Sequence, residues 1–331
     1  MSNRYRALCG LLLGVALLLA ACGGGASTTG GTTAGGLQKV SIGLGYNPDI
    51  QFAPFYVAQS KGYYKAMGLD VTFNHGIVPD LIGSMVAGQN TFVFAGGDEL
   101  LVARSKNVKG IDVATIFQKY PVSLIVPADS PIKTLADLKG HTVGTPGPYG
   151  STYTGLLALL YKQKLALSDI KVQPIGFTQV DALLNHKVDA VMGYSNNEPL
   201  QLRKHGMNVR TFAVSDYQPL ISNGIITTED RYHNQQKMVN EFVQATLKGV
   251  KDVIADPEGA LKISKSFVPN LNEEQAREVL AATIPIWKSS NGQAGYNDPA
   301  VWASMQQFLV AQKMIPAGQD LAQAYTNQTL G

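Results

Sequence analysis

Several short loops of this chain place side chains with binding chemistry directly after apolar runs that are typical of buried strands. In open α/β sheets, ligands bind at the carboxyl ends of the strands, so such loops are candidate binding sites. Aromatic rings there can stack on a flat ligand, and carboxylates and amides can bond to its N–H and hydroxyl groups. The loops in question are residues 46–51, 98–99, 145–152 and 194–199.

Catalytic and metal-binding patterns are missing from the sequence. It has no Gly-x-Ser-x-Gly elbow, and its two cysteines, Cys9 and Cys22, precede the expected folded body. The histidines are scattered without the spacing of metal ligands. They are His75, His141, His186, His205 and His233. We therefore predict no enzymatic activity, no catalytic residue, no metal site and no resident cofactor.

Charge narrows the class of ligand. The candidate loops contain no Lys or Arg, so sulfonate, phosphate and carboxylate ligands lack their usual partner. The net charge of +3 over 331 residues is small and gives no reason to expect a nucleic acid.

The first loop belongs to a strand–loop–helix–strand unit. Loop 46–51 follows an alternating apolar run, and Pro54 suits the first turn of a helix because that position needs no N–H. Gly62 can close the helix in a left-handed conformation. A short helix over 63–67 then precedes a strand that begins at Leu69.

Later loops are positioned by helices as well. Asp98 stands where a helix should begin, so its carboxylate is expected both to cap free N–H groups and to point into a cleft. A helix over 152–164 begins with unpaired N–H groups that suit an electronegative ligand atom. The C-terminal part reads as helices over 235–255, 257–267, 272–283 and 299–313.

The sequence resembles a known family, the NMT1/THI5-like class of ABC transporter solute-binding proteins, which includes binders of thiamine precursors and of riboflavin. The resemblance extends over about residues 38–230, and its motifs occur in the family's order. They are GYNPDIQFAPFYVAQSKGYYKAMGLDV, MVAGQNTFVFAGGDELLVAR, SLIVPADSPIKTLADLKGHTVGT and ALLNHKVDAVMGYSNNEPLQL.

The resemblance implies an α/β fold of the type II periplasmic-binding-protein kind, in which two lobes joined by two crossings close on a ligand. It implies a first lobe from two chain segments, 38–127 and 222–331, and a second lobe from residues 128–221. It also implies a cleft lined by Tyr46, Asn47, Asp49, Gln51, Asp98, Glu99, Tyr149, Ser151, Tyr194, Asn196 and Glu198.

The first loop departs from the members that bind the thiamine pyrimidine precursor. Those members have Trp where Tyr46 stands and His near Gln51, and the branch found beside riboflavin permeases is the better match. Riboflavin, with an uncharged ring system and a chain of hydroxyls, also fits tyrosines and acceptors without a cation. We expect riboflavin as the transported ligand, with a formylaminopyrimidine-type precursor as the alternative.

The N-terminus reads as an export signal. Arg4 and Arg6 precede an apolar run that is too short to span a bilayer, and Leu19-Ala20-Ala21-Cys22 looks like a lipobox. We predict a lipoprotein signal peptide over 1–21, a lipid on Cys22 and a Gly- and Thr-rich tether over 22–37. An ordinary signal peptide with a chance cysteine is the alternative.

These features together predict a monomeric lipoprotein on the outer face of the cell membrane. Its expected partners are the small-molecule ligand and the transmembrane subunits of an ABC permease with its ATPase, and no nucleic acid. Two alternatives from other classes are a pyrimidine-synthase-like enzyme, which would carry a cysteine-rich motif and an active-site histidine, and a receptor subunit, which needs a signalling domain.

Overall fold

The computed structural model describes residues 36–289 and 291–331. The predicted signal peptide, the lipidation site Cys22 and most of the predicted tether lie outside the described residues. Among the helices of the described part, none is both long enough and apolar enough to cross a membrane.

The first sheet has the strand order β2-β1-β3-β10-β4. Strand β1 (Gln38–Leu44) pairs in parallel with β2 (Leu69–His75) and with β3 (Phe92–Gly96). Strand β10 (Asn223–Thr228) runs antiparallel between β3 and β4 (Gly110–Thr115). The chain therefore returns from the second lobe to complete, with β10, the sheet that the N-terminal segment began.

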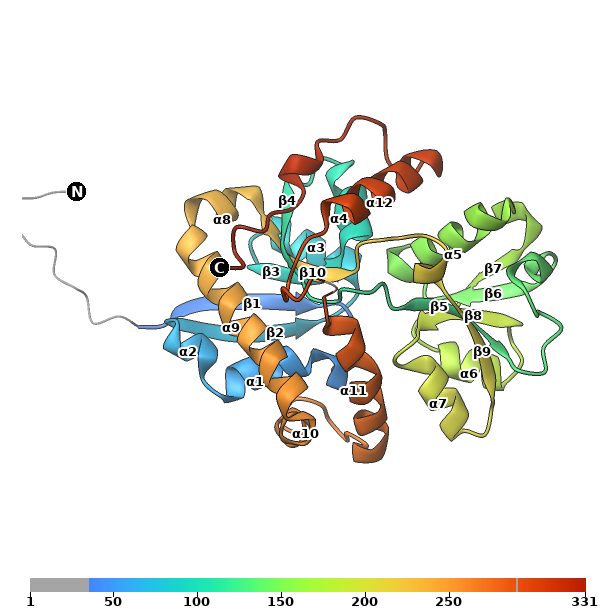
Figure 1. The fold of residues 1–331 in the computed structure, drawn as a ribbon, viewed down its shortest axis with the longest axis horizontal. Coiled ribbons are helices and arrows are strands. Elements are labelled where there is room, and N and C mark those ends of the chain that lie inside the picture. The colour runs from blue at the N-terminus through green and yellow to red at the C-terminus, as the bar shows by residue number, and fades with distance from the viewer. Residues whose placement is uncertain (1–35, 290) are drawn as a thin grey trace, which may run out of the picture. The chain divides into compact units, whose positions relative to one another are not determined.

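The second sheet has the order β7-β6-β8-β5-β9 and forms a separate group of strands (Figure 1). Strand β5 (Val122–Pro127) lies between β8 (Ala190–Tyr194) and β9 (Val209–Ala213) and is antiparallel to both. Parallel pairing adds β6 (Thr142–Thr145) and β7 (Lys171–Pro174). The expected α/β fold of two lobes is confirmed.

One predicted boundary needs correction. Residues 38–127 were assigned to the first lobe, but β5 lies inside the second sheet, so the first crossing falls at 116–121. The second crossing falls at 214–222. The apolar run of β5 shows that it is a buried strand, whereas its sheet is decided by pairing with β8 and β9, which follow much later in the chain.

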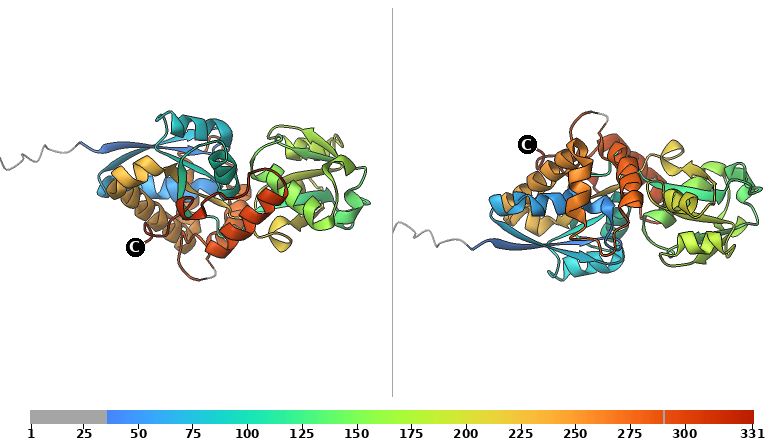
Figure 2. Two further views of the ribbon diagram at one scale, coloured as in Figure 1. Left: turned by 90° about the horizontal axis from the view of Figure 1, so that it is seen from above. Right: turned by 90° about the horizontal axis from the view of Figure 1, so that it is seen from below.

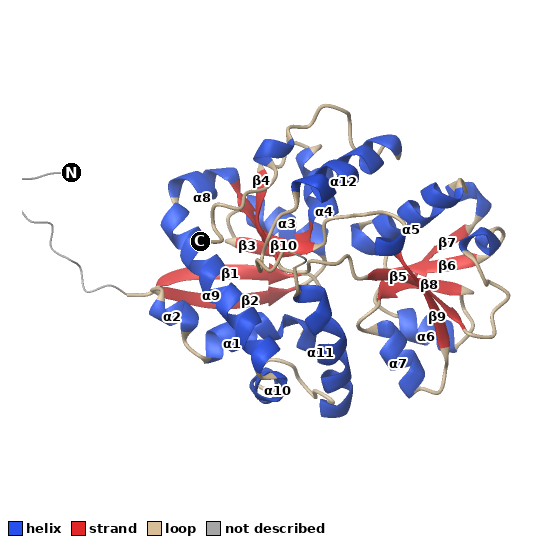
Figure 3. Cartoon of the chain, viewed as in Figure 1, coloured by secondary structure: helices blue, strands red, loops and turns tan. Residues whose placement is uncertain are grey.

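Helices cover the faces of both sheets (Figures 2 and 3). The second sheet carries α5 (Gly150–Gln163), α6 (Gln179–Leu184) and α7 (Glu198–Lys204). The other helices belong to the first lobe: α1 (Ala53–Ser60), α2 (Tyr63–Ala66), α3 (Val78–Val86), α4 (Gly97–Arg104), α8 (Glu229–Asn234), α9 (Gln236–Ala255), α10 (Pro257–Ser264), α11 (Glu273–Trp287) and α12 (Pro299–Ala311).

Helix α9 packs on α1 and on the first sheet through close contacts. A side chain at Gly249 would place its Cβ 2.2 Å from the Pro54 carbonyl oxygen, so only glycine lets the two helices approach this far. The Phe242 ring stacks on Phe92 at 4.2 Å and on Tyr64 at 5.2 Å between centroids. Burial of these rings gives the first lobe much of its hydrophobic stabilisation.

Helix α11 extends further than the sequence pattern predicted. It was expected to end at Thr283 but continues through Pro285 to Trp287. A proline near the C-terminal end removes only one backbone donor, and the buried Trp287 ring packs against Phe117. Tertiary packing therefore outweighs the helix-breaking tendency of Pro285.

The C-terminal segment returns to β4 through a buried polar network. Asp112 N–H donates to the Ala324 carbonyl at 2.8 Å, and Asn297 Nδ2 donates to Asp112 Oδ1 at 3.2 Å. Asn297 Oδ1 accepts from Thr115 Oγ1 and from Trp302 Nε1, at 2.8 and 2.9 Å. One amide thus links β4, α12 and the C-terminal residues of the first lobe.

Candidate ligand-binding pocket

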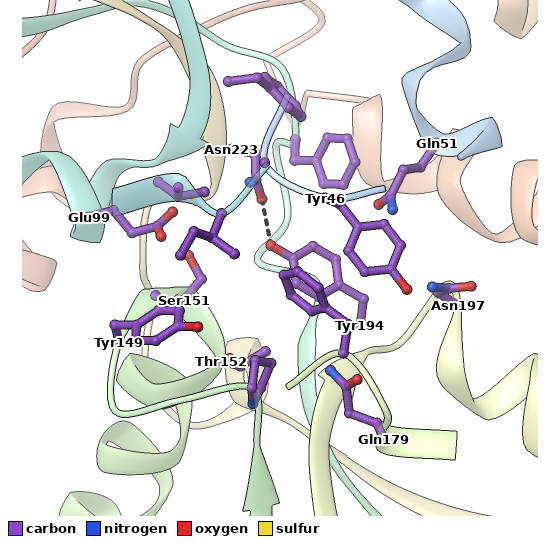
Figure 4. A pocket seen from close by; sticks show the side chains of 18 of the residues that line it. Tyr46, Gln51, Glu99, Tyr149, Ser151, Thr152, Gln179, Tyr194, Asn197 and Asn223 are labelled. Carbon is purple, nitrogen blue, oxygen red and sulfur yellow. Dashed lines mark hydrogen bonds between the residues drawn. The ribbon is translucent and has the colours of Figure 1, made fainter. Parts of the chain in front are cut away.

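A pocket lies where the loops of the two lobes meet, at the carboxyl ends of β1, β6 and β8 (Figure 4). The space free of atoms in and in front of it is about 750 Å³, open solvent included. Aromatic rings and uncharged polar groups dominate its lining: Gly45, Tyr46, Gln51, Phe52, Ile77, Val78, Pro79, Phe94, Glu99, Phe117, Pro146, Tyr149, Gly150, Ser151, Thr152, Phe177, Gln179, Tyr194, Asn197, Glu198 and Asn223.

Most of the residues predicted to bind ligand are brought together in this pocket. Both lobes contribute, which places the expected walls opposite each other (Figure 4). The predicted residues that line the pocket are Tyr46, Gln51, Glu99, Tyr149, Ser151, Tyr194 and Glu198. Those that do not line it are Asn47, Asp49, Asp98 and Asn196.

The residues outside the pocket have other roles. Asn47 is exposed in its loop, and Asp49 caps a short 3₁₀ helix (Ile50–Phe52) by accepting from Gln51 N at 3.0 Å. Asn196 is buried and donates from Nδ2 to Thr283 Oγ1 at 2.8 Å. Polar residues after a strand can therefore serve turns and packing as readily as a ligand.

Aromatic rings from both lobes form the apolar walls. The Tyr46 ring, from the loop after β1, meets the Phe177 ring of the second lobe edge to face, with centroids 5.0 Å apart and an interplanar angle of 81°. Phe52, Phe94 and Phe117 continue the first-lobe wall as edge-to-face pairs at 6.1 and 5.6 Å. Such walls suit a flat ring system.

Tyr194 reaches from the end of β8 to the start of β10. Its hydroxyl donates to Asn223 Oδ1 at 3.3 Å, drawn as a dashed line in Figure 4. Burial, together with the nearby carboxyl groups, raises the pKa of Tyr194 above its usual value, so the phenol stays uncharged. In the same view the Tyr46 hydroxyl points toward Asn197.

Two acidic residues at the start of α4 behave differently from each other. Glu99 lines the pocket and accepts from Gly96 N at 2.9 Å, so Glu99, rather than Asp98, caps the helix. Burial and the adjacent Asp98 raise the pKa of Glu99. Asp98 is fully buried behind the pocket, where Ser151 Oγ donates to its Oδ1 at 2.9 Å.

The start of α5 approaches this acidic pair closely. Gly150 has a φ of +76°, which glycine adopts without strain, and a Cβ there would lie 3.2 Å from Glu99 Oε1. A Cβ at Gly96 would lie 2.2 Å from Asp98 Oδ1 and 2.5 Å from Ser151 Oγ. Both glycines are required by the close packing of α4 against α5.

Glu198 and Asp49 add two more carboxyl groups near the pocket. Glu198 Oε2 accepts from Tyr194 N at 2.7 Å, and burial raises the pKa of Glu198 to about 7. Burial raises the pKa of Asp49 to about 6. No Lys, Arg or His lines the pocket in the described part of the chain, so these acids have no cationic partner there.

Several lining residues were not expected from the sequence. Phe94 and Phe117 sit in apolar runs that also predict plain core, and nothing local distinguishes the two roles. Asn197 lines the pocket while its neighbour Asn196 does not, a one-residue difference set by the backbone after β8. Phe177 belongs to a loop after an exposed strand. An aromatic residue in such a loop is the one feature of the sequence that could have indicated a place in the pocket.

Metal chemistry finds no support in the described residues. Across 36–289 and 291–331, no three His, Cys, Asp or Glu side chains are grouped so that they could hold an ion. The aromatic rings, amides and hydroxyls that line the pocket can stack on a flat ring and exchange hydrogen bonds with a ligand.

Comparison with known proteins agrees with this description. Residues 49–260 match the family described as NMT1/THI5 like. The riboflavin-binding protein RibY of Chloroflexus aurantiacus is 34% identical, with 88% of this chain and 86% of that protein covered. A formylaminopyrimidine-binding protein of Halalkalibacterium halodurans is 25% identical, with coverage of 83% and 86%.

The fold has close counterparts among solved structures. The alkanesulfonate-binding protein SsuA from Xanthomonas axonopodis pv. citri, bound to MOPS, superposes with a TM-score of 0.72 at 19% sequence identity. The superposition covers 88% of this chain and 99% of that one. The two-lobe fold is thus that of periplasmic binding proteins.

Proposed function

Because this chain belongs to the NMT1/THI5-like family, we propose that it is the solute-binding component of an ABC-type importer and that its solute is riboflavin. The observation that carries the proposal is the pocket itself. Its walls are aromatic, its polar groups are amides, hydroxyls and carboxyls, and no lining residue of the described part is a cation. An uncharged ring with a hydroxylated chain fits that chemistry.

The relatives favour riboflavin over the pyrimidine precursor. The riboflavin-binding relative is 34% identical and the formylaminopyrimidine-binding relative 25%, over similar lengths. Aromatic surfaces of both lobes, Tyr46 and Phe177 among them, suit a large ring better than a single pyrimidine. The pyrimidine precursor remains the second candidate, because Gln51, Asn197 and Gln179 could bond its ring nitrogens.

A catalytic role has less support than a binding role. The relative at 34% identity is a binding protein, whereas relatives described as 4-amino-5-hydroxymethyl-2-methylpyrimidine phosphate synthases are 22–23% identical. The two cysteines of this chain are Cys9 and Cys22, both in its N-terminal region. The chain is therefore a binding protein rather than an enzyme.

Delivery to the permease would follow from anchoring at Cys22. A lipid there, followed by a flexible tether, would hold the folded body close to the membrane on its outer face. In Cys22→Ser we expect the protein to leave the membrane fraction or to remain unprocessed. A variant that fractionates and migrates like the parent would refute the anchor without affecting the binding proposal.

Riboflavin fluorescence gives the direct test of the ligand. Titration of ligand-free protein into riboflavin should dim the emission, because stacking on electron-rich tyrosine favours quenching, and should saturate near one site per chain. Tyr149→Ala, at the pocket, should weaken binding, whereas Tyr161→Ala should not, although the two side chains are similarly exposed at 37% and 42%. Unchanged emission together with no heat of binding would exclude riboflavin, and a thermal shift with the aminopyrimidine precursor would then favour the second candidate.

A further inference from the structure

Asp98 is a buried carboxyl group held between the two lobes. It belongs to α4 of the first lobe and has no exposed surface. Ser151 Oγ, at the start of α5 in the second lobe, lies 2.9 Å from its Oδ1. The hydroxyl of Tyr120, in the first crossing, lies 3.3 Å from its Oδ2. Asp98 therefore bonds to both the opposite lobe and the crossing that joins the lobes.

Counting protons in this network assigns one to Asp98. The Tyr120 hydroxyl has a single hydrogen, and its shorter contact, at 2.8 Å, is to the carbonyl oxygen of Ser151, which can only accept. With that hydrogen used, the contact between Tyr120 and Asp98 Oδ2 becomes a hydrogen bond only if Asp98 supplies the proton. Ser151 Oγ remains the donor to Oδ1.

Within residues 36–289 and 291–331 no positive charge contacts Asp98, and Lys162 of α5 is exposed. Strands β3 and β10 and helix α12, which pack against α4, carry no titratable side chain. The titratable groups nearest Asp98 are Glu99, Tyr120 and Tyr194, with Glu198 next to Tyr194. The Thr154 hydroxyl of α5 and the backbone N–H of Glu99 also bond to Asp98, and both are neutral donors. The remaining titratable groups on elements against α4 are Asp112, which bonds Asn297, exposed Asp80, and Tyr153, Tyr161 and Lys162 of α5.

We propose that Asp98 is a positioning residue that works in its protonated form: its Oδ2 proton goes to the Tyr120 oxygen and its Oδ1 accepts from Ser151, so that bringing the lobes together takes up a proton. Ser151 lines the pocket, so this network fixes the start of α5 against the ligand site. The proposal depends on the proposed function only for which solute the closed pocket holds. Burial, which raises the pKa of Asp98, agrees with it.

The sign of the pH dependence follows from this arrangement. With the lobes together, the pKa of Asp98 lies above its value in an open, hydrated cleft, so closing is most favourable at low pH. Closing then weakens as the pH rises from the open value toward the closed value. Where a full proton is taken up, the riboflavin Kd should rise about tenfold per pH unit.

The first test measures the proton with the lobes held together by ligand. An infrared spectrum of the riboflavin-saturated protein at neutral pH should show the carbonyl stretch of a protonated carboxylic acid that is absent from riboflavin-saturated Asp98→Asn, because the bands of the ligand cancel between the two samples. Glu99→Gln tests the neighbour, because the proton could reside on that carboxyl instead. Calorimetry on the same samples shows separately that riboflavin is bound. If it is bound and Asp98→Asn leaves the spectrum of protonated carboxyl groups unchanged, Asp98 is ionised in the closed state and the proposal is wrong.

The second test measures the consequence for binding. Asn at position 98 can still accept from Ser151 through Oδ1 and donate to Tyr120 through Nδ2, so Asp98→Asn should keep the affinity of the parent at about pH 5 and lose much of its decline toward about pH 8. Asp98→Ala should bind weakly throughout. Asp112→Asn is the control, since Asp112 is equally buried but bonds within the first lobe, and it should keep the parental slope. Equal slopes for the parent and Asp98→Asn would overturn the proposal.

Discussion

Asp98 and Asp112 are chemically alike, but one belongs to a hydrogen-bond network that joins the two lobes and the other to a network within the first lobe. Both are fully buried, have no cationic partner in the described part of the chain, and receive hydrogen bonds from neutral side chains. Asp112 ties β4 to Asn297 and the C-terminal segment, all within the first lobe. Asp98 joins the first lobe to Ser151 of the second.

The difference lies in which equilibrium each carboxyl group can affect. A bond within one lobe is lost only on unfolding, so Asp112 should contribute to stability alone. A bond across the two lobes is also lost when they separate, so Asp98 should contribute to binding as well. Burial and raised pKa alone therefore do not identify a functional acid, whereas the elements that it connects do.

The largest effect is expected from Asn297→Ala, which removes the centre of the first-lobe network. It removes the hydrogen bonds that Asp112, Thr115 and Trp302 make to this amide, so we expect a loss of about 3 kcal/mol in the free energy of unfolding, measured by urea denaturation. Asn234→Ala, whose amide makes only an exposed bond to Asp230, should cost about 0.5 kcal/mol or less. Equal losses of unfolding free energy in the two variants would mean that the buried network stabilises the fold no more than one exposed hydrogen bond does.

Asp112→Asn should change the pH dependence of stability. Burial raises the pKa of Asp112 to about 7 in the folded chain, above its value in the unfolded chain. Its contribution is therefore complete at acid pH and is lost as the pH rises toward 7. The variant has no group that titrates at this position and avoids this loss. Between about pH 5 and about pH 8, its free energy of unfolding should therefore rise by roughly 2 kcal/mol relative to that of the parent. Parallel curves of unfolding free energy against pH would contradict this.

Gly96→Ala should weaken binding by disturbing the contact between the lobes. The new Cβ would lie 2.2 Å from Asp98 Oδ1 and 2.5 Å from Ser151 Oγ, and overpacking of this kind costs at least about 1 kcal/mol, or roughly tenfold in Kd if it acts on closing. Gly83→Ala, where a Cβ meets nothing within 4 Å, is the matched control. Unchanged riboflavin affinity in Gly96→Ala would show that this packing is dispensable.

Phe177→Ala should have the smallest effect. It removes the edge-to-face contact with Tyr46, a pair worth about 1 kcal/mol, so the riboflavin Kd should rise about fivefold. The side chain is 38% exposed, so thermal stability should barely change. Leu167→Ala is the control for the loss of an exposed apolar side chain, because Leu167 is similarly exposed in the second lobe and does not line the pocket. A fall in melting temperature with unchanged affinity would assign Phe177 to packing instead.

Much of the fold could be predicted because its signals are local. The turn at Gly62, the helix with Pro54 in its first turn and the helical C-terminal part each follow from nearby residues. Which sheet β5 joins and where α11 ends could not be predicted in this way, because both depend on partners distant in the sequence. Local pattern therefore predicts elements better than it predicts their pairing.

The candidate site shows the same division. The sequence pointed to the loops after β1, β3, β6 and β8, and residues from all of these line the pocket. It could not say which side chain in a loop faces the ligand, as Asn196 and Asn197 illustrate. Nor could it place Asp98 behind Ser151, because that contact exists only once the two lobes meet.

The central claim, an aromatic pocket without a cation that takes an uncharged flat ligand, is tested most directly by comparing riboflavin with its phosphate ester FMN in calorimetric titrations. We expect riboflavin to bind near one site per chain and FMN to bind more weakly, because the phosphate dianion would meet Glu99 and Glu198 rather than an arginine. Tighter binding of FMN than of riboflavin would contradict the account of the pocket.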